Sequence, residues 1–428
     1  MCSFKHFKVR PLMYLYHSPW PPSPAVAPRL DSSSTATIEE EKTPYYDTRH
    51  FYPARLGEIL HDGRYQIATK LGHGSSSTVW LARDLHRWRW SNEKYVAIKI
   101  SSNSQQSHQT AVRNELSILQ HISQQSTTHV GHHFVRRLLD SFTIDGKGGI
   151  RHQCLVLPPL REPLWLYCRR WVGGVIPPEV LKVMIQMMLE GLDYLHTECQ
   201  IIHTDLKSDN IMIKVEDPII LERDARDEYN NPLPQKVTDE RTIYLARNNY
   251  GELVKPTAAV QITDFDLAVS GMTKHTGPIQ VESYRAPEVI LNAGYTYSAD
   301  IWNLGVMLWD LLEGKRLFNP KNLHTSEYDD MLHLAQITAL LGPAPEHMLA
   351  AGQRSSMFYK PDGTLHDPGL VPKDFSFESA IKELTGEEKS GFIEFAKRMI
   401  KWNPSERSTA KELLEDPWLS QDLPQEAE

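Results

Sequence analysis

Cysteine is scarce in this chain, and the spacing of the few cysteines does not match a disulfide or metal-binding pattern. The four, Cys2, Cys154, Cys168 and Cys199, form neither a paired disulfide framework nor a zinc-binding pattern. We therefore expect a reducing, intracellular compartment, either the cytoplasm, the nucleus or both. Secretion is not expected.

Long apolar runs and an excess of positive charge are also missing. No apolar stretch approaches the roughly 20 residues that cross a bilayer, so the sequence predicts no membrane span. The 46 Lys and Arg against 54 Asp and Glu give a formal charge of −8, which argues against direct nucleic-acid binding and mildly favours basic partners. With 428 residues, 40% of them hydrophobic, the chain can bury a large core.

The first 45 residues are turn-rich and do not show the periodicity of a helix or strand. Residues 1–30 contain basic side chains and no acid, and include the stretch PWPPSPAVAP. This composition predicts a disordered tail over 1–45, although it also fits a mitochondrial targeting segment. Aromatic residues first gather in EEEKTPYYDTRHFYP, and we expect 46–63 to pack as an N-terminal extension.

Two glycines lie between apolar segments that alternate as strands do. In RYQIATKLGHGSSSTVWLARD, residues 64–84, Gly72 and Gly74 separate the two segments, which predicts a strand, a glycine turn and a second strand. A dinucleotide-binding loop would instead open a helix. An ordinary turn remains the alternative for this glycine pair taken alone.

A lysine interrupts the next apolar strand. Lys99 stands inside YVAIKI, residues 95–100, where an ammonium is costly to bury unless an anion such as a phosphate lies beside it. The following segment, AVRNELSILQHI, has helical spacing and offers Glu115 as a partner for Lys99. A surface glutamate is the alternative for Glu115.

Two polar loops follow short apolar runs further along the chain. IIHTDLKSDNIMI, residues 201–213, carries Asp205, Lys207 and Asn210, and ITDFD, residues 262–266, carries Asp264. Together these loops supply a general base and two oxygen ligands for a metal. A polar turn closing a buried strand is the alternative for ITDFD taken alone.

In their order along the chain, these motifs resemble those of eukaryotic protein kinases. GHGSSSTV, VAIK, HTDLKSDN, DFD and the APE at 286–288 match the family between roughly residues 64 and 419. FYPARLGEIL, STVWL and HTD are similar to the SR-protein kinases, which phosphorylate serines in arginine/serine-rich segments.

The resemblance implies an α+β, two-lobed kinase fold. The small, mostly antiparallel β N-lobe with one key helix, and the hinge, would cover 64–160. The larger, mainly helical C-lobe would cover 161–419, with a short spacer-like insertion at 214–260, and a tail would follow at 420–428.

The resemblance also implies a serine/threonine protein kinase that uses ATP and Mg²⁺. Asp205 would accept the proton of the substrate hydroxyl, Lys207 would neutralise the transferred phosphoryl, and Asn210 and Asp264 would hold Mg²⁺. The residues that would form the nucleotide site are Leu71, Gly72, His73, Gly74, Ser75, Ser76, Ser77, Thr78, Val79, Ala97, Lys99, Glu115, Pro158 and Leu160. We expect basic arginine/serine-rich protein substrates, and a monomer.

Other residues of the predicted C-lobe take roles from the same resemblance. Asp300 would orient the catalytic loop, and Glu288 would form a buried pair with Arg407. Arg285 resembles an arginine that shapes the substrate site, with an ordinary surface arginine as the alternative.

Two positions depart from the commoner kinase pattern. Asp266 replaces a glycine that lets the backbone take unusual φ values during switching, values that aspartate adopts only at some cost, so we expect less flexibility there. The second carboxylate would also attract metal or repel the nucleotide. This leaves a nucleotide-binding pseudokinase or scaffold with weak activity as the alternative function. Thr204 replaces the arginine of a phosphate-binding pocket found in many kinases, so we expect activity without phosphorylation of residues 264–288.

Overall fold

The computed structural model describes residues 15–30, 37–44, 46–103, 106–238, 241–253, 258–322 and 325–420. The chain divides into two compact units that are each discontinuous in sequence. Unit 1 comprises Met1–Leu116, Arg137–Arg161 and Val215–Glu252, and unit 2 comprises Ser117–Arg136, Glu162–Lys214 and Leu253–Glu428. One unit is built on a sheet and the other on helices, which confirms the predicted fold class.

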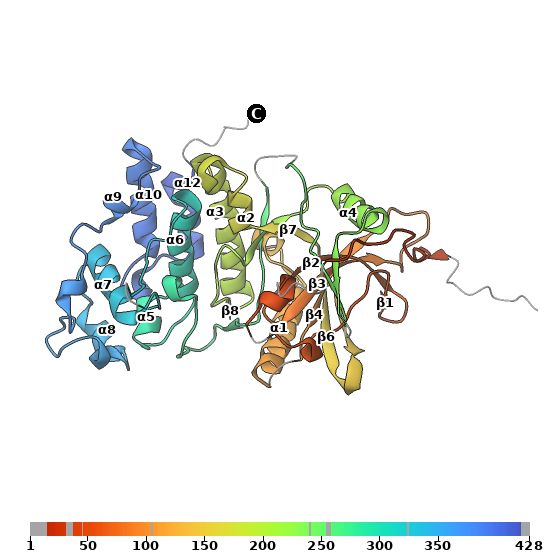
Figure 1. Ribbon diagram of the computed structural model, residues 1–428. Helices are drawn as coiled ribbons and strands as arrows, with labels where there is room; N and C mark the ends of the chain where they lie inside the picture. The colour runs from red at the N-terminus through yellow and green to blue at the C-terminus, as the bar shows by residue number, and fades with distance from the viewer. Residues whose placement is uncertain are drawn as a thin grey trace, which may run out of the picture. The chain divides into compact units, whose positions relative to one another are not determined.

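A six-stranded sheet forms the core of unit 1 (Figure 1). Its order is β1-β2-β3-β4-β6-β5, and all neighbouring strands are antiparallel. The strands are β1 (Ile59–Leu60), β2 (Tyr65–His73), β3 (Ser77–Asp84), β4 (Tyr95–Ser101), β5 (Asp140–Asp145) and β6 (Arg151–Leu157). Apolar side chains that alternate along the strands, such as Ile67, Trp80 and Ile98, pack together on one face. The helix α1 (Gln106–Gln124) follows β4.

Segments before the sheet also belong to unit 1, and so does the insertion at residues 215–252, which we expected in the C-lobe. The insertion contains α4 (Ile219–Asn230) and a hairpin of β10 (Gln235–Val237) and β11 (Thr242–Tyr244). Two short turns, η2 (Glu39–Lys42) and η3 (Thr48–His50), precede the sheet. The backbone of residues 28–30 pairs with Gln235 through two hydrogen bonds of 2.8 Å.

The disordered tail predicted over residues 1–45 thus includes two segments that the structure describes, residues 15–30 and 37–44. The basic side chains Lys5, Lys8 and Arg10 lie outside the described residues. The role of residues 1–14 as a tail or targeting segment therefore stays a prediction.

Helices form most of unit 2. They are α2 (Leu164–Cys168), α3 (Pro178–Asp193), α5 (Pro287–Ile290), α6 (Ser298–Leu312), α7 (Asp330–Leu341), α8 (Glu346–Ala351), α9 (Phe377–Ala380), α10 (Gly386–Met399), α11 (Ala410–Leu414) and α12 (Pro417–Ser420). Helix α6 is buried along almost its whole length, as its all-round apolar sequence predicts. Over the described ranges, no helix is both long enough and apolar enough to cross a membrane.

Two small sheets carry the polar loops of the sequence motifs. β12 (Val260–Ile262), β9 (Ile211–Lys214) and β7 (Leu160–Pro163) form one, and β13 (Val269–Ser270) pairs with β8 (Ile201–Ile202) in the other. The loop 203–210 thus runs from β8 to β9, and the triplet 264–266 follows β12. These connections place both motifs at strand ends.

An ion pair lies in the core of unit 2, as predicted. Arg407 Nη1 and Nη2 donate to the two carboxylate oxygens of Glu288 at 2.6 and 2.7 Å, and both side chains are at most 1% exposed. Arg407 also donates to the carbonyl oxygens of Lys401 and Ser298. Removing one partner of such a buried pair typically costs about 3 to 5 kcal/mol.

Candidate active site

The glycine-rich segment forms the predicted hairpin in unit 1. β2 and β3 pair up to its tip, where the Gly74 N–H donates to the Ser77 carbonyl at 2.9 Å. The register shifts between Lys70 and Gly72, which marks a β-bulge. A Cβ built on Gly72 would meet no atom within 4 Å. Packing within the protein therefore does not require glycine at this position.

Lys99 and Glu115 form the predicted pair within the same unit. Lys99 Nζ lies 2.7 Å from Glu115 Oε1, and the two side chains are 17% and 5% exposed. Lys99 stands in the middle of β4, opposite Val79 on β3 and Leu155 on β6. The ammonium is thus held in place by one carboxylate beside the hairpin.

The remaining predicted nucleotide-site residues of unit 1 lie on or next to the same sheet. Ala97 is fully buried on β4. Pro158 follows β6, and Leu160, which is 4% exposed, begins β7. Leu71 and His73 lie on β2, Ser77, Thr78 and Val79 lie on β3, and Ser75 and Ser76 lie between them.

The catalytic-loop residues converge on one carboxylate in unit 2. Asp205 Oδ2 accepts hydrogen bonds from Lys207 Nζ at 2.7 Å and from Asn210 Nδ2 at 3.0 Å. Asn210 Nδ2 also donates to the Asp205 carbonyl oxygen at 2.8 Å. Asp205 is 8% exposed, so its carboxylate is held in one orientation by its neighbours.

The two predicted metal ligands come from adjoining backbone segments. The Asn210 carbonyl accepts from the Thr263 N–H at 2.8 Å and from the Thr263 hydroxyl at 3.1 Å, which ties the loop to the residue before Asp264. Because Asn210 Nδ2 donates to Asp205, the side-chain oxygen of Asn210 points away from Asp205. Mg²⁺ prefers such oxygen ligands and usually keeps waters and phosphate oxygens as well, so an amide and a carboxylate fit this ion.

No larger ligand cluster takes the place of this pair. Among the described residues, no group of three or more His, Cys, Asp and Glu side chains could hold a metal ion.

Asp300, buried on α6, fixes the backbone at the start of the catalytic loop. Its carboxylate accepts from the N–H groups of His203 and Thr204 at 2.8 and 2.9 Å, as the sequence predicted for an orienting residue. His196 Nε2 lies 2.9 Å from the same carboxylate. Sequence reasoning missed His196, because no motif contains it.

The backbone of the triplet 264–266 takes a positive φ at its first residue. Asp264 has a φ of 66°, whereas Asp266 is not among the non-glycine residues with positive φ. Asp266 therefore adopts a backbone conformation open to any residue here, and the predicted loss of flexibility at this position stays a prediction. Phe265 between them is 1% exposed, and its ring centroid lies 5.2 Å from that of His203.

A cavity of about 420 Å³ lies next to Lys207 in unit 2. It is lined by Trp165, Lys207, Ser208, Asp209, Val281, Tyr284, Asp310 and Arg316. The Tyr284 hydroxyl donates to Asp310 at 2.5 Å, and burial raises the pKa of the Asp310 carboxyl above its usual range. Sequence reasoning singled out neither Asp209 nor Asp310, although Asp209 lies within the HTDLKSDN motif.

Comparisons with known proteins agree with this arrangement. A model of the protein kinase domain matches residues 65–419. A serine/threonine protein kinase of Aspergillus fumigatus is 37% identical over 95% of this chain and 97% of its own length. The serine/threonine-protein kinase SRPK of Physarum polycephalum is 30% identical over 92% of this chain and 94% of its own. SRSF protein kinase 3 of Mus musculus is 24% identical over 94% of both chains.

The fold also has a solved counterpart. The crystal structure of a kinase domain superposes on this chain with a TM-score of 0.65 and 24% sequence identity. The match covers 87% of this chain and all of the other.

Proposed function

This chain belongs to the protein kinase family as an ATP-dependent serine/threonine kinase, and from that premise we propose that it phosphorylates serines in arginine/serine-rich protein segments. We further propose that it binds ATP and Mg²⁺ itself, as members of this family generally do. The pseudokinase alternative finds no support, since Lys99, Glu115, Asp205, Asn210 and Asp264 are all present.

The observation that carries the proposal is the hydrogen-bonded set of Asp205, Lys207 and Asn210. Phosphoryl transfer depends mainly on positioning and on the stabilisation of charge. Asp205 would accept the proton of a serine hydroxyl, and Lys207, which donates to the same carboxylate, would bring positive charge to the transferred phosphoryl. Mg²⁺ held by Asn210 and Asp264 would neutralise charge on the phosphates.

The nucleotide contacts would come from unit 1. Lys99, held by Glu115, would bind the α- and β-phosphates through charge-assisted hydrogen bonds. The open space beside Gly72 supports a close approach of the hairpin backbone to phosphate.

Two observations support the arginine/serine-rich substrate class. Relatives that match over most of both chains are named SRPK and SRSF protein kinase. In addition, Asp209 and Asp310 line the cavity next to Lys207, where carboxylates would pair with a substrate guanidinium.

The test of the activity is magnesium-dependent transfer from ATP to a peptide of arginine–serine repeats. We expect kcat/KM for this peptide to exceed that for its alanine–serine counterpart by more than about tenfold, or about 1.4 kcal/mol. Asp205→Asn and Lys99→Met should each abolish transfer while leaving the fold intact, because each removes a positioned group and little core volume. Near-wild-type turnover in either variant would refute the assigned roles.

The proposed binding of a substrate arginine in the cavity of Asp209 and Asp310 is tested with Asp310→Asn. Asp362→Asn, at an exposed acid of unit 2, is the matched control. Asp310→Asn should lower kcat/KM for the arginine peptide by about tenfold, a typical loss for a charged contact, and leave the alanine peptide unaffected. An equal loss on both peptides would show that Asp310 supports the fold and does not select arginine.

A further inference from the structure

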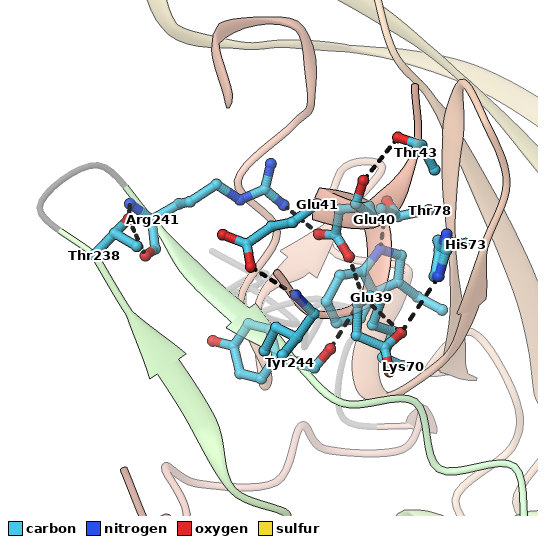
Figure 2. Close-up of polar contacts among 12 residues, drawn as sticks. Glu39, Glu40, Glu41, Thr43, Lys70, His73, Thr78, Thr238, Arg241 and Tyr244 are labelled. Carbon is cyan, nitrogen blue, oxygen red and sulfur yellow. Dashed lines mark hydrogen bonds and ion pairs between the residues drawn. The ribbon is translucent and has the colours of Figure 1, made fainter. Parts of the chain in front are cut away.

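Consecutive glutamates on the η2 turn of unit 1 reach buried cations on other segments. Glu39 Oε2 lies 3.3 Å from Lys70 Nζ on β2. Glu40 bridges two cations, because it pairs with Lys70 through one oxygen and with Arg241 at 3.0 Å through the other (Figure 2). Lys70 Nζ also donates to the Tyr244 carbonyl at 3.0 Å.

These charges are removed from water. The side chains of Lys70, Glu40 and Arg241 are 0%, 1% and 3% exposed. Two carboxylates, from Glu39 and Glu40, balance the two cations. Buried charges are strongly destabilising when one partner is removed, so the turn cannot leave unit 1 without stranding an ammonium and a guanidinium.

The contacts fall where β2 becomes the glycine-rich hairpin. Lys70 comes immediately before the register shift that ends at Gly72, and a bulge of this kind redirects the strand that follows it. Glu39 Oε2 also lies 3.9 Å from His73 Nε2, beyond the bulge. Glu39 therefore contacts β2 on both sides of Gly72, as Figure 2 shows for Lys70 and His73.

We infer that Glu39 and Glu40 are positioning residues for the nucleotide site, which act through Lys70 and His73. They fix the direction in which β2 enters the hairpin and so set where residues 72–78 cover the ATP phosphates. The inference rests on the proposed ATP-dependent activity. A displacement of about 1 Å in such a loop is enough to weaken a phosphate contact.

The test compares the same substitution at three neighbouring positions. Glu39→Gln and Glu40→Gln should each raise KM for ATP by about tenfold, while kcat changes by less than about threefold and KM for the peptide stays unchanged. Glu41→Gln is the matched control, because Glu41 pairs with Lys236 at 2.9 Å on the insertion hairpin and not with β2. Its KM for ATP should stay within about twofold of wild type.

A second readout does not depend on activity. Hydrogen–deuterium exchange of the amides of residues 72–78 should be at least fivefold faster in Glu39→Gln and Glu40→Gln than in Glu41→Gln. If wild-type protein transfers no phosphate, the proposed function fails, and this exchange measurement still decides the positioning role. If Glu40→Gln is unfolded at the assay temperature, the measurements on Glu39→Gln alone test the inference. The Glu39 side chain is 16% exposed, so its substitution disturbs the core less than that of Glu40.

The inference is overturned if folded variants at positions 39 and 40 keep wild-type KM for ATP and wild-type exchange. It is also overturned if Glu41→Gln has the same effect as the other two, because that result would indicate a general loss of stability.

Discussion

Asp266 is the residue at which this chain departs most clearly from the kinase pattern. Since the positive φ falls on Asp264, the observed backbone does not need a glycine at 266. We predict that Asp266→Gly preserves or raises turnover and shifts the magnesium dependence, because the change removes a carboxylate two positions from the metal ligand. Kinetics over a magnesium titration would check this prediction.

The same variant also tests whether Asp266 supports the fold. Glycine should lower the free energy of unfolding by no more than about 1 kcal/mol, which a denaturant titration would measure. A protein that no longer folds would identify Asp266 as a structural anchor and contradict the prediction.

His333 on α7 is a buried histidine outside the site. It is fully buried, with Nδ1 3.2 Å from the Tyr328 hydroxyl, and burial lowers its pKa to about 3. In the unfolded chain the imidazole would titrate near pH 6.5. Between these two values only the unfolded state binds the proton, so acidification through this window lowers the free energy of unfolding.

We predict that His333→Asn flattens the pH dependence of stability below pH 6.5. The wild-type protein should lose up to about 1.4 kcal/mol per pH unit from this group, and the variant should not. Denaturant titrations at several pH values would measure the difference, with the exposed His347→Asn as control. Parallel pH profiles for wild type and His333→Asn would contradict the assignment.

At the scale of elements, the segment 264–288 is held by contacts that need no phosphate. The Thr204 hydroxyl donates to the Leu267 carbonyl at 2.8 Å. Gln280 accepts from the Ala286 N–H and donates to the Ala299 carbonyl at 2.8 and 3.0 Å.

Arg285, the residue that could still have formed a phosphate pocket, has partners within the protein. Its guanidinium lies 4.9 Å from the Tyr328 ring centroid and 3.7 Å from Asp330. It is therefore not an ordinary surface arginine, and its predicted role in shaping the substrate site stays a prediction.

We therefore predict full activity without phosphorylation of Ser270, Thr273, Thr276, Ser283 or Tyr284. Turnover of phosphatase-treated protein, verified by mass, should equal that of protein preincubated with ATP. A rise of more than about tenfold on preincubation, about 1.4 kcal/mol of barrier, would show that phosphorylation is a switch.

The elements that the sequence predicted correctly are those defined by local patterns. The hairpin around Gly72, the strand of Lys99 and the polar loop of Asp205 each follow from the pattern of apolar and polar residues within a window of about ten residues. The docking of Glu40 does not, because its partners lie 30 and 201 residues away. The sequence could not predict the role proposed for Asp310 either. Helical periodicity places this residue on α6, but it does not show that the residue lines the cavity beside Lys207, which is about 100 residues away along the chain.

At the scale of the whole molecule, the order of five motifs predicted a part built on a sheet and a part built on helices. It did not predict the bounds of the two units, because residues 215–252, expected in the C-lobe, belong to unit 1. The spacing of motifs could not show that residues 15–30 pack on unit 1. Trp20 is the main anchor of that segment: its ring lies 4.2 Å from the Arg83 guanidinium and 5.4 Å from that of Arg226. The backbone N–H of Trp20 donates to Gln66 Oε1 at 2.9 Å.

We predict that Trp20→Ala lowers the free energy of unfolding by about 2 kcal/mol, through lost apolar burial and cation–π contacts. Denaturant titration would measure this change. Trp90→Ala is the control, since Trp90 is 74% exposed and its removal should cost less than about 0.5 kcal/mol. Equal stability of the two variants would show that the Trp20 side chain does not anchor this segment.

The discontinuity of unit 1 has a consequence for synthesis on the ribosome. Glu40 and Arg241 are 201 residues apart, so at roughly 5 to 20 residues per second the guanidinium is made roughly 10 to 40 seconds after the carboxylate. During that interval Glu40 and Lys70 lack one of the charges that surround them in the finished protein. Unit 1 is therefore completed only after residues 117–136 and 162–214 of unit 2 have been made. A nascent chain halted before residue 241 would carry a glycine-rich hairpin that lacks one of the cations paired with Glu40.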